Sequence, residues 1–139
     1  MNIYLDTSLL VALFTDDPFS GQADLLIGQS NALLVGDYAA AEFASSIARL
    51  TRTQELTILE ARTVFANFDS WMRRAVTAIE TVSSDIHVAE GFLRRLDLTL
   101  RADDALHIAV AQRVGADLAT FDTKMSASAR TLGVPLAKV

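Results

Sequence analysis

Short apolar runs alternate along the chain with longer segments in which apolar residues recur every three or four positions. Most of the runs are four or five residues long and contain few polar residues, which is typical of strands covered on both faces. The pattern predicts strands at residues 2–5, 32–35, 78–82, 117–121 and 135–137. It predicts helices at residues 7–15, 17–30, 38–52, 58–74, 84–96, 102–114 and 123–132. Strands that alternate with helices indicate a parallel sheet sandwiched between helices, which is an α/β fold.

Capping residues mark several of the predicted helix ends. Thr57 and Glu60 match the capping box, in which a hydroxyl and a carboxylate each accept a backbone amide hydrogen. Gly115 closes the helix at residues 102–114, because glycine tolerates the left-handed conformation that ends many helices. Further helix starts are predicted at Asp17-Pro18, Asp37 and the pair Ser83/Ser84.

Length and composition restrict the class of protein. The chain has 139 residues, of which 51% are hydrophobic and 21% charged, and this excludes a disordered chain. We predict a single domain over residues 1–139. The longest apolar run, residues 9–14, is far shorter than the about 20 residues of a membrane-spanning helix. The N-terminus lacks the basic and apolar regions of a secretory signal, so we expect a cytoplasmic protein with no membrane partner.

Acidic residues stand where predicted strands end and helices begin. Asp6 and Asp122 each follow an apolar strand and precede a threonine, and each alone could be an ordinary N-cap. The carboxyl ends of parallel strands share one edge of the sheet, however, and ligands bind at that edge. Glu42 follows three alanines in the first turns of the predicted helix at residues 38–52. The simpler interpretation of this acid is that it interacts favourably with the helix dipole. Asp103 and Asp104 open an apolar helix in which only one of them is needed as a cap, so the other requires a cation or hydrogen-bond donors.

Together these residues resemble a known family. The matching segments are Asp6-Thr7-Ser8, Glu42, Asp104-Ala105-Leu106-His107-Ile108-Ala109 and Thr120-Phe121-Asp122. In order and spacing they are similar to PIN-domain ribonucleases, in particular to the VapC-type toxins of bacterial and archaeal toxin–antitoxin pairs. The resemblance covers the whole chain and implies a three-layer α/β/α PIN-like fold with a short, mostly parallel central sheet.

The resemblance also implies a site and its partners. It implies that the protein is a ribonuclease that hydrolyses RNA phosphodiester bonds, with Mg²⁺ or Mn²⁺ as the cofactor. The implied catalytic and metal-binding residues are Asp6, Glu42, Asp104 and Asp122, with Thr7 and Ser8 as supporting hydroxyls. A homodimer and a cognate antitoxin that blocks the site are implied as well. Asp103 and Asp117 match no position of the family pattern.

The donor chemistry agrees with the implied metal. Magnesium prefers hard oxygen ligands such as carboxylates, and the chain has no cysteine and only two histidines, which does not fit zinc. The formal net charge of −5 argues against a protein that coats nucleic acid without bound cations. Because four carboxylates in one cluster repel one another, we expect raised pKa values for some of them in the absence of metal.

Basic residues near these acids are the predicted contacts to the RNA backbone. The candidates are Arg49, Arg52, Arg101 and Lys124. Arg49 follows Glu42 by seven residues, which places both on one face of a helix. His107 is expected to pack beside the sheet, and a general base is the other interpretation.

Aromatic and small side chains give two further expectations. Trp71, Phe65 and Phe68 recur at helical spacing. We therefore expect them to form part of the core or of a dimer surface, rather than a platform on which bases stack. The small side chains at residues 39–41 and 44–46, with the helix at residues 17–30, predict a groove for an antitoxin helix. An arginine of that antitoxin could reach the acids.

Other functions were weighed against this one. A housekeeping RNA-processing PIN nuclease without an antitoxin stays open, and so does a PIN-like module that binds a partner without catalysis. A phosphotransferase of the haloacid dehalogenase type requires a second aspartate at position 8, which is Ser8. A response-regulator receiver requires an acceptor aspartate near residue 50, and residues 48–54 contain no acid.

Overall fold

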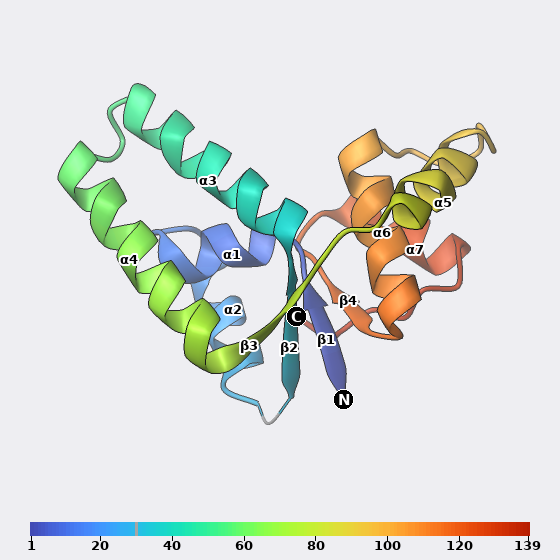
Figure 1. The fold of residues 1–139 in the computed structure, drawn as a ribbon, viewed down its shortest axis with the longest axis horizontal. Helices are drawn as coiled ribbons and strands as arrows, with labels where there is room; N and C mark the ends of the chain where they lie inside the picture. The colour runs from blue at the N-terminus through green and yellow to red at the C-terminus, as the bar shows by residue number, and fades with distance from the viewer. Residues whose placement is uncertain (30) are drawn as a thin grey trace.

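The computed structural model describes residues 1–29 and 31–139 and contains a four-stranded parallel sheet between two groups of helices (Figure 1). The strands are β1 (Asn2–Leu5), β2 (Ala32–Gly36), β3 (Val76–Ile79) and β4 (Asp117–Ala119). The helices are α1 (Thr7–Phe14), α2 (Ser20–Ile27), α3 (Asp37–Arg52), α4 (Ile58–Ala75), α5 (Ser83–Leu93), α6 (Ala102–Val114) and α7 (Thr123–Thr131). Helices α1–α4 pack on one face of the sheet and α5–α7 on the other, which confirms the predicted α/β/α fold.

The strand order β3-β2-β1-β4 creates a crevice at one end of the sheet. From β1 the chain moves to β2 and β3 on one side, and it then crosses to place β4 on the other side of β1 (Figure 1). Helices α1 and α7, which follow β1 and β4, therefore cover opposite faces. In parallel sheets a ligand crevice opens beyond the carboxyl ends of the two strands where the order reverses. Here these are β1 and β4, whose pairing ends at Leu5 opposite Ala119.

Each face of the sheet carries its own core. On the first face the rings of Phe14, Phe43, Phe68 and Trp71 pack together with centroids 4.6–6.3 Å apart. Trp71 is 7% exposed, so it belongs to the core. On the second face α6 is buried continuously over residues 105–111. This confirms the prediction of a helix that is apolar on nearly all sides.

Local hydrogen bonds place the start of α2 later than predicted. The Asp17 carboxylate accepts the amide of Phe19 at 2.9 Å, which closes a turn instead of a helix. The Ser20 hydroxyl donates to the carbonyl of Ala12 at 2.7 Å, and α2 begins at that serine. The prediction of a helix end at Ser30 lies outside the described residues, and α2 ends at Ile27.

Two predicted caps are wrong. Asp37 is the first residue of α3, and its carboxylate accepts the amide and the hydroxyl of Thr81 at 3.1 and 2.6 Å. The start of α5 is held by Asp85, which accepts the amide of Val82 at 2.9 Å, rather than by a serine at 83–84. Helix α5 ends at Leu93 instead of residue 96. In contrast, the capping box of α4 and the left-handed Gly115 after α6 are confirmed.

Strand pairing sets the ends of β3 and β4. Pairing with β2 stops at Ile79, so β3 occupies Val76–Ile79 rather than residues 78–82. β4 ends at Ala119 rather than at residue 121, because its partner β1 ends there. The predicted strand at residues 135–137 is a single bridge between Leu136 and Leu118. Among the helices described, none is both long and apolar enough to cross a membrane.

Candidate active site

The four predicted acids line one cavity beyond the carboxyl ends of β1 and β4. Asp6 follows β1 and caps α1, and Asp122 caps α7. Glu42 comes from α3, and Asp104 comes from the first turn of α6. The cavity has a volume of about 150 Å³, and its other lining residues are Thr7, Ser8, Asp103, His107 and Met125. Acids that are distant in sequence thus meet at the reversal of strand order.

Asp6 is the most deeply buried of the four acids, with 3% of its surface exposed. It accepts the Ser8 hydroxyl at 2.5 Å and the amide of Leu9 at 3.2 Å. Burial raises the pKa of Asp6 above its usual value, although these hydrogen bonds act in the opposite direction. The Ser8 hydroxyl also accepts the amide of Phe121 at 3.0 Å, which ties the end of β1 to the segment after β4.

Glu42 is held by two side chains that bind the same carboxylate oxygen. The Thr7 hydroxyl donates to Oε1 at 2.7 Å, and Nε2 of His107 contacts Oε1 as well. Burial opposes ionisation of Glu42, but the hydrogen bonds from His107 and then Thr7 outweigh it, so its pKa is lowered. Glu42 is therefore kept as a carboxylate in a half-buried position.

A buried tyrosine completes this network. The hydroxyl of Tyr4 lies 2.8 Å from Nδ1 of His107, and both side chains are almost fully buried. Burial, followed by the charge of Asp6, raises the pKa of Tyr4, so its hydroxyl keeps its proton and can donate to Nδ1. That bond places the ring proton on Nε2, facing Glu42. A Cβ atom on Gly36 would lie 2.7 Å from the Tyr4 hydroxyl, so the glycine makes room for it.

Sequence reasoning missed the role of Tyr4 in this network. His107 packs beside the sheet as expected, but its partners come from β1 and α3, far away in sequence. The signal that could have found it is a tyrosine between the aliphatic Ile3 and Leu5 of a strand, together with Gly36 at the end of the neighbouring strand. Asp103, which matched no family position, also lines the acidic cavity.

Asp104 and Asp122 are less buried than Asp6. Burial raises the pKa of Asp104, the amide of Arg101 opposes this by donating at 3.3 Å, and repulsion from Asp103 and Asp122 adds to the rise. Like-charge crowding was expected to be the main cause of raised pKa values. Burial is instead the larger cause at both Asp6 and Asp104, because the crevice encloses them.

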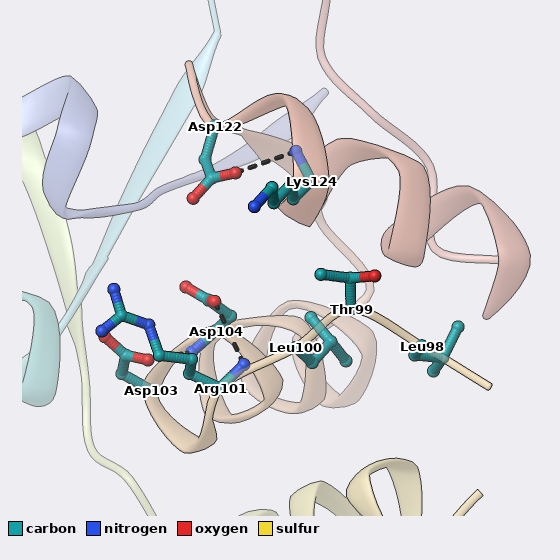
Figure 2. Close-up of a pocket in the computed structure, with 8 residues that line it drawn as sticks. All are labelled: Leu98, Thr99, Leu100, Arg101, Asp103, Asp104, Asp122 and Lys124. Carbon is teal, nitrogen blue, oxygen red and sulfur yellow. Dashed lines mark hydrogen bonds between the residues drawn. The ribbon is translucent and has the colours of Figure 1, made fainter. Parts of the chain in front are cut away.

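A larger cavity of about 650 Å³ adjoins the acids on the side of α6 and α7. Figure 2 shows Asp122 and Lys124 on the α7 wall, opposite Asp103, Asp104 and Arg101. Two of the predicted RNA contacts thus lie directly beside the acids. The other two, Arg49 and Arg52, are exposed on the last turns of α3 and are not among the described residues that line either cavity.

The side chains of the cavity carry the donor atoms that a hard cation prefers, but among the described residues they are not arranged as a metal site. Carboxylates and two hydroxyl groups from Thr7 and Ser8 provide the oxygen donors that Mg²⁺ or Mn²⁺ prefers. Within residues 1–29 and 31–139, no three acidic or histidine side chains already stand in an arrangement that would hold a metal ion. Of the four acids, Asp122 is the one that is exposed to solvent.

Comparison with known proteins identifies the family. The family described as PIN domain matches residues 3–130, which is most of the chain. The chain belongs to the PIN domain family. This PIN domain is 38% identical over 65 residues to Ribonuclease VapC46 of Mycobacterium tuberculosis (strain ATCC 25618 / H37Rv). The match covers 45% of this chain and 50% of the relative, so the PIN domain spans about half the length of that relative.

Solved structures show the same fold at low sequence identity. VapC20 from Mycobacterium tuberculosis, described as a sarcin-ricin loop cleaving toxin, has a TM-score of 0.72 and 22% identity, with 91% of this chain and 94% of that chain covered. VapBC2 from Rickettsia felis, solved bound to a DNA fragment from its promoter, has a TM-score of 0.72 and 16% identity. That match covers 99% of this chain and 98% of the other. The arrangement of strands and helices is therefore that of known PIN domains.

Proposed function

We propose that this PIN domain is a metal-dependent endoribonuclease toxin of the VapC type. The observation that carries the proposal is the convergence of Asp6, Glu42, Asp104 and Asp122 on one cavity at the reversal of strand order. The similarity to Ribonuclease VapC46 and the shared fold with VapC20 support the choice of RNA as the substrate.

The residues of the cavity have distinct roles in this proposal. Asp6, Asp104 and Asp122 would hold Mg²⁺ or Mn²⁺, and Glu42 would bind through Oε2 because Thr7 and His107 occupy Oε1. A bound divalent ion lowers the pKa of water and neutralises the charge of the phosphate. The neighbours of Glu42 keep it ionised, and Ser8 orients Asp6.

The cationic residues would guide the RNA backbone to the acids. Arg101 and Lys124 stand on the larger cavity beside Asp104 and Asp122, where they can contact phosphates on one side of the cut. Arg49 and Arg52 would contact RNA farther along α3. Their guanidinium groups lie away from the acidic cavity, so their loss should weaken binding without changing the chemical step.

A cognate antitoxin is the proposed regulator. Its helix would lie in the predicted groove of small side chains on α3, and a basic residue would enter the acidic cavity. Of the small side chains predicted for that groove, Ser46 lines a cavity of about 390 Å³ that adjoins the acids, together with Asp17 from the turn before α2, whereas Ala39 is buried in the core. An antitoxin in this position would compete directly with RNA. We also propose that the toxin is a cytoplasmic homodimer, which sedimentation can measure.

The test is cleavage of total RNA by the purified protein in MgCl₂. Wild type is expected to cleave, and excess chelator is expected to stop it. Asp6→Asn and Asp104→Asn should lose cleavage, whereas Asp69→Asn, an exposed acid on α4, should keep it. Mg²⁺ should also raise the melting temperature of wild type, since a ligand that binds the folded state stabilises it, and should do so less in Asp6→Asn.

Two results would contradict the proposal. One is cleavage that persists in both active-site variants or in excess chelator. The other is a wild-type protein that neither cleaves RNA nor responds to Mg²⁺. A protein that cleaves but has no inhibitor encoded beside its gene would instead be the housekeeping nuclease.

A further inference from the structure

Two phenylalanines form a stacked pair beside the acidic cavity. The rings of Phe19 and Phe121 lie with centroids 4.6 Å apart and planes 12° from parallel. Phe19 comes from the turn before α2 and is 42% exposed, and Phe121 comes from the segment between β4 and α7. Parallel-stacked rings with one partner open to solvent are a surface on which a further flat ring can stack.

The cavity at this pair adjoins the acidic cavity and shares lining residues with it. Phe19 and Phe121 line the cavity of about 390 Å³, together with Val11, Asp17 and Ser46. Three further lining residues, Thr7, Ser8 and Asp122, also line the acidic cavity. A substrate with its phosphate at the acids would therefore extend directly over the aromatic pair.

The two cavities beside the acids differ in their cationic side chains. The cavity toward α7 is lined by Asp103, Asp104 and Asp122 but also by Arg101 and Lys124, which can contact a phosphate there. The lining of the aromatic cavity includes Asp17 and Asp122 but no lysine or arginine among the described residues. A phosphate is disfavoured there, whereas a neutral base is not.

We propose that Phe19 and Phe121 form a stacking subsite for one unpaired nucleobase of the RNA, adjacent to the phosphodiester that is cut. This inference rests on the proposed ribonuclease function and specifies its substrate as single-stranded at the cut. Every base has a π-face, so stacking on the pair tolerates any sequence. Asp17 and Ser46 stand where they can read the base edge, because a carboxylate accepts hydrogen bonds from exocyclic amino groups.

The first experiment measures cleavage of a single-stranded RNA oligonucleotide that wild type cuts. Phe19→Leu and Phe121→Leu should each raise KM about tenfold and leave kcat nearly unchanged, because the base stacks away from the reacting bond. Phe19→Trp keeps a flat ring and should retain the wild-type KM. The control is Phe65→Leu, a partly buried ring on α4 remote from the cavity, which should not change KM.

The second experiment detects stacking without cleavage. The Asp104→Asn protein is mixed with the same oligonucleotide carrying the fluorescent base aminopurine on either side of the cut. Fluorescence should be quenched at one of the two positions, and adding Phe19→Leu should remove the quenching. Placing that position in a duplex should abolish the quenching, and it should also abolish cleavage of the oligonucleotide by wild type.

Each other outcome overturns the inference. If wild type cleaves but both leucine variants keep its KM and its quenching, the pair does not bind a base. If the variants cleave normally but escape inhibition by a co-expressed antitoxin, the pair anchors a protein instead. A wild type that cleaves no RNA would contradict the proposed function, which the first assay distinguishes before any variant is compared.

Discussion

The ends of β1 and β4 carry the same sequence pattern but different surroundings. Asp6 and Asp122 each follow an apolar segment, precede a threonine and cap a helix. Asp6 follows the end of a central strand and is 3% exposed, whereas Asp122 follows the edge strand β4 and is exposed. Identical local chemistry thus produces a buried carboxylate at one strand end and a solvated one at the other.

The two aspartates have equally local hydrogen-bond partners, and it is their neighbours that differ. Asp6 accepts hydrogen bonds from residues two and three positions ahead, and so does Asp122. Beside Asp6, however, Thr7 binds Glu42 and Tyr4 binds His107, across 35 and 103 positions of the chain. The β1 end is therefore supported from several elements, whereas the hydrogen bonds of Asp122 come from the first turn of α7.

The largest expected difference is in activity. Asp6→Asn should reduce cleavage by more than about 100-fold, because even outer-shell partners of metal ligands contribute about 10–100-fold. Asp122→Asn should lose less, since water can replace an exposed ligand. Single-turnover rates in MgCl₂ measure both variants. Equal losses would mean that burial does not separate the roles of the two acids.

The second expected effect concerns the support of Glu42. Tyr4→Phe removes the hydroxyl that binds His107 and should lower the cleavage rate about tenfold by loosening the orientation of Glu42. Gly36→Ala should have the same effect, because its Cβ would displace that hydroxyl. The Mg²⁺ concentration for half-maximal rate should rise in both variants.

The matched control is Tyr38→Phe, which alters another tyrosine whose ring lies beside His107. It should leave the rate and the Mg²⁺ requirement unchanged. The double variant Tyr4→Phe/Gly36→Ala should be no slower than either single variant, since both remove one contact. Additive losses would indicate two separate structural effects and no relay to Glu42.

The third expected effect is on stability, where the two aspartates should respond differently. Without metal at neutral pH, Asp6→Asn should raise the free energy of unfolding by about 0.5–2 kcal/mol, as is common when a functional site is relaxed. Asp122→Asn should change it little, because asparagine is an equally good N-cap. Asp122→Ala should lower it by about 1 kcal/mol through loss of the cap. Denaturant unfolding measures all three, and a destabilised Asp6→Asn would contradict the assigned burial cost.

The smallest expected effect is the pH dependence of the stability that Asp6→Asn gains. The pKa of Asp6 is raised from 3.8 in the folded protein, so the unfolded chain loses this proton first as pH rises. Ionised Asp6 therefore destabilises the fold above pH 3.8, and protonated Asp6 does not. The stability advantage of Asp6→Asn should be smallest at low pH and grow as pH increases. A pH-independent difference would mean that charge burial is not its origin.

Three of the four acids sit at recognisable element ends, and the resemblance to PIN-domain ribonucleases added Glu42, which lies within α3. Asp6 and Asp122 follow apolar segments. Asp104 lies in the first turn of α6, whose bounds match the predicted helix at residues 102–114. Errors occurred where a short polar side chain had a choice of partners. Asp37 binds Thr81 instead of capping α3, and Asp17 closes a turn before α2, and neither choice follows from local propensity.

The sequence by itself determined the alternation of strands and helices and the apolar character of both faces of the sheet, which depend on periodicity and capping over a few residues. The four acids were predicted through the resemblance to PIN-domain ribonucleases. Only the tertiary structure decided which acid is buried, which oxygen of Glu42 is held, and that Phe19 stacks on Phe121 beside the acids. Those features depend on strand order and on contacts between distant segments, which local patterns do not encode.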